Sequence, residues 1–159
     1  VLKEKIKPNG KSDIPISNLD IFPTILQYAG VSPDTLSLDG ENLAPILEEK
    51  QTALERPLFW HFPIYLQAYN VNDNETRDSL FRTRPGSVVR KGDWKLHYYF
   101  EDDGIELYNL LEDIGERNNL AETHPEKKEE LLLLLKQWWK DTDAPIPTEL
   151  NPEYIEKIY

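Results

Sequence analysis

Three basic side chains, His61, Arg82 and Arg84, could contact a polar or charged ligand. His61 ends an apolar run, residues 56–62, which reads as a buried β-strand. A histidine at a strand end can face a polar pocket, or it can be a structural residue held by hydrogen bonds, and both interpretations stay open. Arg82 and Arg84 could hold an anion such as a carboxylate or a sulfate through two parallel hydrogen bonds. They could equally form salt bridges with the acidic surface.

The composition of the 159-residue chain excludes several function classes. The chain contains no cysteine, which excludes thiol chemistry and cysteine-derived cofactors within it. Its formal net charge of −11 argues against nucleic acid as a partner. No apolar run approaches the length of a membrane span. Since the chain begins at Val1 and has no methionine, we expect it to be part of a longer polypeptide.

Residues 84–121 predict an antiparallel meander of three strands. The two turns contain glycine beside lysine or aspartate, as tight hairpin turns require. In the middle strand, apolar and polar residues alternate, which is typical of a strand with one buried face. Lys95 and His97 fall on the other face, where we expect them to be solvated. The strands and turns are residues 87–90, 91–93, 94–100, 101–104 and 105–109.

The amino-terminal part predicts a helix after Ser17. Ser17 and Asp20 have the spacing of a capping box, and Gly30 is placed to end the helix. We expect a short 3₁₀ turn before Pro23, with the regular helix starting near that proline. Apolar residues recur between these signals at helical spacing: Leu19, Phe22, Ile25, Leu26 and Ala29.

A longer helix is predicted after Pro125, which suits a first helical position. Its apolar stripe suits a core position against one face of a sheet. The expected fold class is therefore α+β, with a small antiparallel sheet of about four strands packed against a long C-terminal helix. Residues 65–81 read as a long loop and residues 144–159 as an extended surface strap. The stripe consists of Leu131, Leu134, Leu135 and Trp138.

Two motifs of the meander region resemble the carboxy-terminal subdomain of type I sulfatases, in the alkaline-phosphatase-like superfamily. Residues 87–97 are similar to the family pattern S-[AS]-[VI]-R-x-G-x-[WY]-K-L-[IH]. Residues 106–121 are similar to E-L-Y-[DN]-L-x-x-D-x-x-E-x-x-N-L-A. Residues 15–31 resemble a helix of the family's large catalytic domain, and residues 38–47 resemble a turn followed by a short helix. The resemblance covers the carboxy-terminal third or so of a sulfatase, of the bacterial arylsulfatase and carbohydrate sulfatase kind.

This resemblance implies a division of the chain and an activity for its parent. Residues 1–50 would be the tail end of the sulfatase α/β catalytic domain, and residues 51–159 the C-terminal subdomain. The parent would hydrolyse sulfate esters, with carbohydrate sulfates expected, by means of a formylglycine hydrate and Ca²⁺. The family places that nucleophile and its metal ligands upstream of Val1. We therefore expect no catalytic residue, no metal ligand and no activity in this chain alone, and we read Asp102-Asp103 as a hairpin turn. Phosphonate and phosphate ester hydrolases of the same superfamily remain an open alternative.

The resemblance also implies contacts with substrate. In relatives, the loop after a W-H-[FY]-P strand and the residues before S-[AS]-[VI]-R reach over the catalytic pocket. His61, Arg82 and Arg84 are accordingly the candidate substrate-binding residues, although Ile64 stands where many relatives have a second histidine. Aromatic residues of the long loop, including Tyr65, could stack on sugar rings or anchor the loop. The implied ligand is a sulfated small molecule or glycan.

The expected partner is the rest of the sulfatase catalytic domain, and the expected location is the periplasm or the cell exterior. The competing hypothesis is a non-catalytic carbohydrate-binding or interaction domain derived from the sulfatase subdomain. Such a free-standing domain would expose Phe22, Ile25 and Leu26, an apolar patch that favours dimerisation.

Overall fold

The computed structural model describes residues 4–67 and 81–149. The chain forms two compact units, Val1–Arg56 and Pro57–Tyr159. The boundary expected near residue 50 lies within the first unit. The assignment of the amino-terminal residues to a large catalytic domain stays a prediction.

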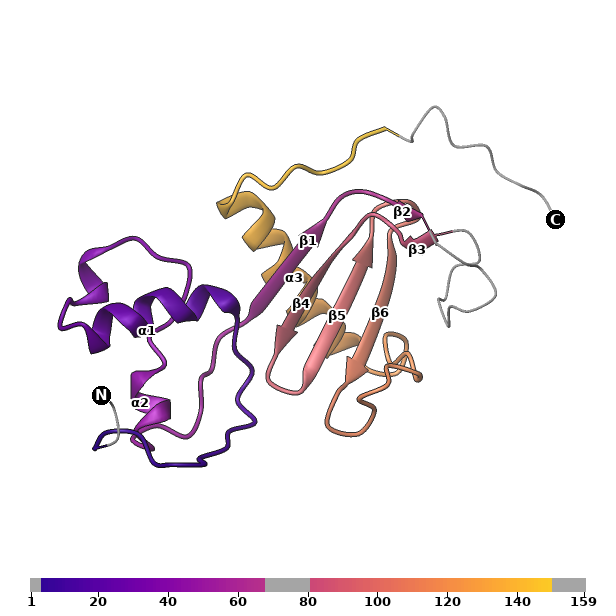
Figure 1. The fold of residues 1–159 in the computed structure, drawn as a ribbon. Coiled ribbons are helices and arrows are strands. Elements are labelled where there is room, and N and C mark those ends of the chain that lie inside the picture. The colour runs from indigo at the N-terminus through magenta and orange to yellow at the C-terminus, as the bar shows by residue number, and fades with distance from the viewer. Residues whose placement is uncertain (1–3, 68–80, 150–159) are drawn as a thin grey trace. The chain divides into compact units, whose positions relative to one another are not determined.

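The first unit contains a 3₁₀ turn that leads directly into a helix (Figure 1). The turn η1 spans Asn18–Asp20 and α1 spans Ile21–Tyr28. The predicted capping box is present, since the Ser17 backbone N–H donates to Asp20 Oδ2 at 2.7 Å. Gly30 follows the helix with φ +82°, a conformation that favours glycine. A second turn η2 spans Pro33–Thr35, and a short helix α2 spans Ala44–Leu47.

The second unit is a four-stranded antiparallel sheet in the order β1-β4-β5-β6 with one long helix. Two residues, Gly92 and Asp93, connect β4 to β5, and the φ of +58° at Gly92 meets the needs of this tight turn. The expected α+β class is confirmed. The elements are β1 (Leu58–Phe62), β4 (Gly86–Lys91), β5 (Trp94–Tyr99), β6 (Gly104–Asn109) and α3 (Pro125–Asp141).

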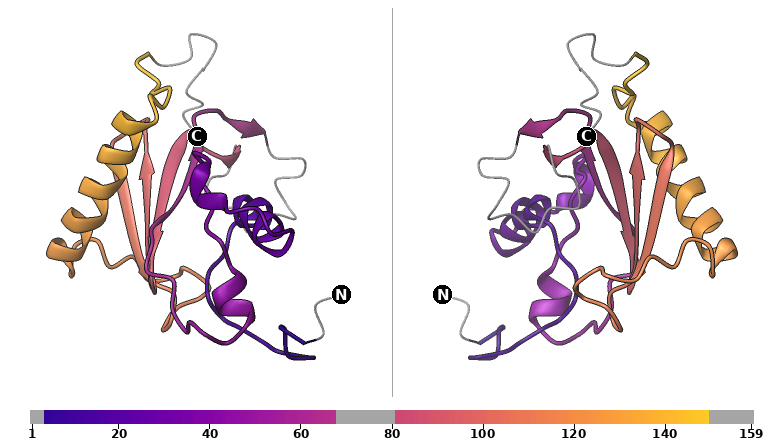
Figure 2. Two further views of the ribbon diagram at one scale, coloured as in Figure 1. Left: turned by 90° about the vertical axis from the view of Figure 1, so that its left-hand side faces the viewer. Right: turned by 90° about the vertical axis from the view of Figure 1, so that its right-hand side faces the viewer.

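Helix α3 lies along one face of this sheet, as Figure 2 shows. Leu131 and Leu135 of the predicted stripe are fully buried, and Trp138 packs beside them on Phe59 of β1 with ring centroids 5.0 Å apart. The sheet supplies the other half of the core through Val89, Leu96 and Leu107, which are also fully buried. The interface between helix and sheet is thus the core of the second unit.

The predicted long loop begins and ends in short paired strands. Strand β2 (Leu66–Gln67) pairs with β3 (Phe81–Thr83) in antiparallel fashion. The pairing draws together the two ends of the loop. Residues 68–80, including Tyr69, lie outside the described residues, as do residues 150–159 of the predicted strap.

Candidate functional site

His61 is held at the end of β1 by hydrogen bonds to both of its ring nitrogens. Nδ1 lies 2.7 Å from the Ser87 hydroxyl, and Nε2 lies 3.0 Å from the backbone carbonyl of Pro145. A carbonyl can only accept, so Nε2 donates to Pro145, and the Ser87 hydroxyl can donate to Nδ1. The Trp139 indole N–H donates to the same Ser87 oxygen at 2.9 Å. The chain of donors thus runs from α3 through the sheet to the segment after α3.

The ring of His61 is packed as well as hydrogen-bonded. It meets Phe100 edge-on, with centroids 5.7 Å apart, and lies 6.2 Å from the ring of Trp138. These contacts are those expected of the structural interpretation, in which His61 holds Pro145, just after α3, against β1. A substrate contact by His61 stays a prediction.

Arg84 lies just before β4 and faces two carboxylates. Its Nη1 is 3.4 Å from Asp102 Oδ2 and 3.7 Å from Glu101 Oε2, and its guanidinium carbon lies 4.3 Å from the centroid of the Tyr99 ring. This arrangement matches the salt-bridge interpretation. An anion-binding role for Arg84 stays a prediction. Arg82 belongs to β3, and its side chain lies outside the described residues.

A pocket of about 460 Å³ opens at this same end of the sheet, where β1 ends and β4 begins. Its walls are mostly proline and aromatic side chains, with the carboxylates of Glu101 and Glu149 among them. None of the described residues that line it is a lysine, arginine or histidine. His61 and Arg84 stand behind its walls, through Phe100 and Glu101 respectively. The lining residues are 63–65, 85, 100–101 and 147–149.

The opposite face of the sheet carries a partly buried charge cluster that the sequence did not predict. Glu116 accepts from Lys95 Nζ at 2.6 Å through one oxygen and lies 2.7 Å from His97 Nε2 through the other. Only 17% of the His97 side chain is exposed. The expectation that Lys95 and His97 would be solvated is therefore wrong, because the chain after β6 folds back over them.

Burial and charge shift the ionisation of this cluster. Burial lowers the pKa of His97, and the Lys95 charge lowers it further, against the opposing effect of Glu116. Burial would raise the pKa of Glu116, but the hydrogen bonds and charges of Lys95 and His97 outweigh it and leave that pKa lowered. His97 is therefore favoured in its neutral form beside a charged Lys95–Glu116 pair.

Two further polar side chains of the motif at residues 106–121, Asp113 and Asn119, support the loop after β6. Asp113 Oδ2 accepts from the backbone N–H groups of Arg117 and Asn118 at 2.6 and 2.8 Å. Asn119 Oδ1 accepts from the N–H groups of Leu107 and Ala121, each at 3.0 Å. These side chains satisfy backbone donors in a segment without regular structure. Asp113 and Asn119 of the 106–121 motif therefore hold the backbone of this loop in place.

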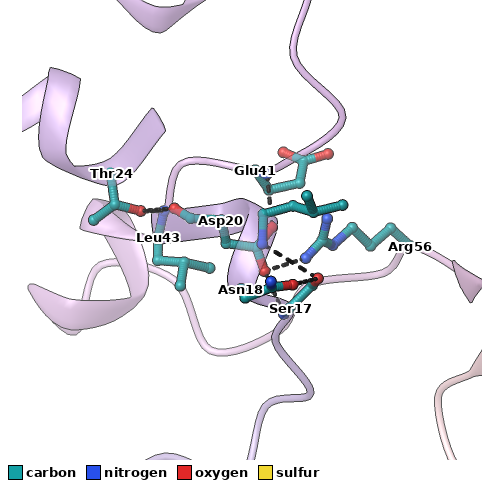
Figure 3. Close-up of polar contacts among 8 residues, drawn as sticks. Ser17, Asn18, Asp20, Thr24, Glu41, Leu43 and Arg56 are labelled. Atoms are coloured by element: carbon teal, nitrogen blue, oxygen red, sulfur yellow. Dashed lines mark hydrogen bonds and ion pairs between the residues drawn. The ribbon is translucent and has the colours of Figure 1, made fainter. Parts of the chain in front are cut away.

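Asp20 organises the first unit (Figure 3). Its fully buried carboxylate accepts from the N–H groups of Ser17 and Glu41, at 2.7 and 2.9 Å, and pairs with Arg56. A Cβ on Gly40 would lie 2.1 Å from the Leu19 carbonyl oxygen, so only glycine allows this close approach. The predicted capping role of Asp20 is confirmed, whereas its pairing with Arg56 has no signal in the local sequence.

Within residues 4–67 and 81–149, no three histidine or acidic side chains are grouped so that they could hold a metal ion. The helices of this described part are all too short or too polar to cross a membrane. Among the described residues, the pocket at the end of the sheet has a size suited to a small ligand.

Comparisons with known proteins agree with the motifs. Residues 2–142 match the family described as N-sulphoglucosamine sulphohydrolase, C-terminal. A sulfatase of Formosa agariphila is 32% identical over 90% of this chain and 26% of its own length. An N-acetylglucosamine-6-O-sulfatase of Bacteroides thetaiotaomicron is 30% identical over 87% of this chain and 24% of its own length. The chain thus spans about a quarter of the length of these relatives.

A solved structure supports the fold at the same time. It shares 25% sequence identity with 92% of this chain, has a TM-score of 0.67, and was determined in complex with its substrate D-glucosamine-2-N,6-O-disulfate. This chain corresponds to 28% of that protein.

Proposed function

The chain belongs to the family of N-sulphoglucosamine sulphohydrolase C-terminal regions, and on that basis we propose that it is the carboxy-terminal part of an enzyme hydrolysing carbohydrate sulfate esters. The observation that carries this proposal is the match over residues 2–142, which covers most of each unit. Relatives named as sulfatases, and a structural neighbour bound to a disulfated glucosamine, support a sulfated sugar as the substrate.

The proposal assigns the reacting groups to polypeptide outside this chain. A formylglycine needs a Cys or Ser in a C/S-x-P-S/A-R motif, which this sequence lacks. Ca²⁺ needs several oxygen ligands, and the described residues offer no suitable cluster. The described residues therefore do not fit Ca²⁺, and the sequence does not fit a formylglycine precursor. In this proposal, the chain completes the fold of the enzyme, and its loops at the end of the sheet contribute to the substrate pocket.

The first unit supports contact with further sulfatase polypeptide. Phe22 and Ile25 of α1 are 54% and 58% exposed, and Leu19 beside them is 53% exposed. Such an apolar group on η1 and α1 is typical of a surface that another part of a protein covers. Leu26, expected in the same patch, is half-buried. This exposure favours the rest of the catalytic domain as partner over a free-standing binding domain. From the resemblance alone, we place the parent in the periplasm or outside the cell.

The test compares two kinds of ester with the full-length parent enzyme. We expect release of inorganic sulfate from N-acetylglucosamine 6-sulfate at a far higher rate than release of phosphate from the matching 6-phosphate. We expect neither product from the 159-residue chain assayed alone. Faster release of phosphate than of sulfate would contradict the proposal and favour the phosphate ester hydrolases of the superfamily.

A further inference from the structure

We propose that the pocket at the end of the sheet binds an uncharged, hydroxyl-bearing part of a sugar and excludes the sulfate group. We call it the strap pocket, since residues 147–149 form one of its walls. The choice of a sugar rests on the proposed function, whereas the exclusion of sulfate rests on the lining itself.

The size and walls of the strap pocket suit a small polar ring. Its volume of about 460 Å³ falls in the range of small-molecule sites, which is roughly 300–1,000 Å³. Pro63, Pro85 and Pro147 give it rigid apolar sides, and Phe100 adds an aromatic side. A sugar ring presents C–H groups to such surfaces and hydroxyl groups at its rim.

The polar groups of the strap pocket are mainly acceptors. Carboxylates, such as those of Glu101 and Glu149, only accept hydrogen bonds. The Tyr65 hydroxyl, which could donate, already donates to Glu101 Oε1 at 2.5 Å. The Thr148 hydroxyl, which can donate as well as accept, is the remaining side-chain donor among the described lining residues, so a ligand that brings several donors of its own suits this pocket best. Sugar hydroxyl groups supply them, whereas a sulfate group offers acceptors alone.

The charge of the strap pocket points the same way. Two carboxylates line it, and its described lining includes no cationic side chain. A nearby cation, Arg84, lies over the Tyr99 ring and directs its Nη1 toward Glu101 and Asp102. A bound sulfate would meet the charge of Glu149 and that of Glu101, which Arg84 offsets only in part, and the described lining residues include no cation to attract it. The sulfate of a bound substrate must then lie outside this pocket.

The strap pocket is formed before any ligand arrives. His61 fixes the strap through the Pro145 carbonyl, two residues before Pro147. On the opposite side, pairing of β2 with β3 holds the chain that follows Tyr65. A site whose walls are fixed in this way loses little conformational freedom on binding.

The test is a titration of the whole chain with N-acetylglucosamine and with its 6-sulfate, followed by NMR of aromatic side chains. We expect the neutral sugar to shift the Phe100 and Tyr65 signals, and the 6-sulfate to bind at least about tenfold more weakly. Absence of shifts with the neutral sugar, or tighter binding of the sulfated one at these residues, would overturn the proposal. Equal binding of piperidinium, a ring cation without hydroxyl groups, would also overturn it in favour of an amine site.

A variant separates charge exclusion from other causes. Glu149 is exposed on the strap, so Glu149→Gln removes one pocket charge with little risk to folding. We expect it to reduce the discrimination against the 6-sulfate by about threefold or more. The matched control is Glu129→Gln, the same change on an exposed face of α3, which should leave the discrimination unchanged. The proposed exclusion would be contradicted if Glu149→Gln left the ratio of the affinities for the neutral sugar and the 6-sulfate unchanged, or if both variants changed this ratio equally.

This test is independent of the parent's activity. If the full-length enzyme releases sulfate but the strap pocket binds no sugar, the sulfatase proposal stands and the pocket proposal is wrong. If the pocket binds the neutral sugar but the parent releases no sulfate, the pocket remains a sugar site and the sulfatase proposal is wrong.

Discussion

Ser87→Ala is the substitution that tests the structural role of His61 most sharply. Ser87 is 1% exposed, and its oxygen lies 2.7 Å from His61 Nδ1 and 2.9 Å from Trp139 Nε1. The alanine leaves one donor and one acceptor without this partner. A buried polar group left unsatisfied costs about 1–3 kcal/mol, and both rings are only partly buried, so we expect a total loss of roughly 2 kcal/mol. For a unit of this size, that corresponds to a fall in Tm of about 8–16 °C.

Tryptophan fluorescence during urea denaturation gives a clean assay. All four tryptophans belong to the second unit, so their emission reports that unit regardless of the first. Trp139→Phe removes the indole N–H, and the double-mutant cycle with Ser87→Ala should show a coupling of about 0.5–1.5 kcal/mol. Ser37→Ala, an exposed serine of the first unit, serves as the control. A loss below about 0.5 kcal/mol for Ser87→Ala, together with additive effects in the cycle, would refute the reasoning.

Three further predictions concern the charged and close-packed sites. Asp20→Ala should lower the free energy of unfolding of the first unit by about 3–5 kcal/mol, because it leaves a partly buried arginine and two backbone N–H groups without their partner. Hydrogen exchange at the amides of the first unit should become faster, and unchanged exchange would contradict this prediction. Gly40→Ala should destabilise the first unit by roughly 1–3 kcal/mol. The control Gly10→Ala should not, because its new Cβ would lie 3.4 Å from the nearest atom. Equal losses of stability in the two variants would contradict the close approach at Gly40. The lowered pKa of His97 means that the unfolded chain takes up its proton at higher pH than the folded chain, so the stability of the second unit should fall as the pH drops below the ordinary value of 6.5. Because the pKa of Glu116 is also lowered, the second unit should lose further stability as the pH drops below 4.5. An NMR titration that places the pKa of His97 above 6.5 would contradict this account.

The local elements were predictable from the sequence because local chemistry dictates them. Alternating apolar residues in β5, the glycine between β4 and β5, and the serine–aspartate pair before α1 each fix a conformation within a few residues. The leucine stripe of α3 likewise predicted its packing on the sheet. These signals also carried the family resemblance, which the match over residues 2–142 confirmed.

The contacts that join distant segments were not predictable in the same way. Arg56 reaches Asp20, the Pro145 carbonyl reaches His61, and Glu116 covers His97, each across many residues of chain. The spacing of apolar residues along the sequence does not predict such a contact, because the contact depends on the path that the loops take back to the sheet. For this reason Lys95 and His97 were wrongly expected to be solvated, and the strap pocket went unforeseen.

The most direct test of the central claim is release of sulfate by the full-length parent enzyme. The upstream nucleophile is first verified as formylglycine by mass spectrometry, and a disulfated glucosamine then serves as substrate. We expect one equivalent of inorganic sulfate for each ester bond cleaved, and none from this chain alone. A parent that carries formylglycine yet releases no sulfate from any sulfated sugar, or a chain that releases it unaided, would contradict the account.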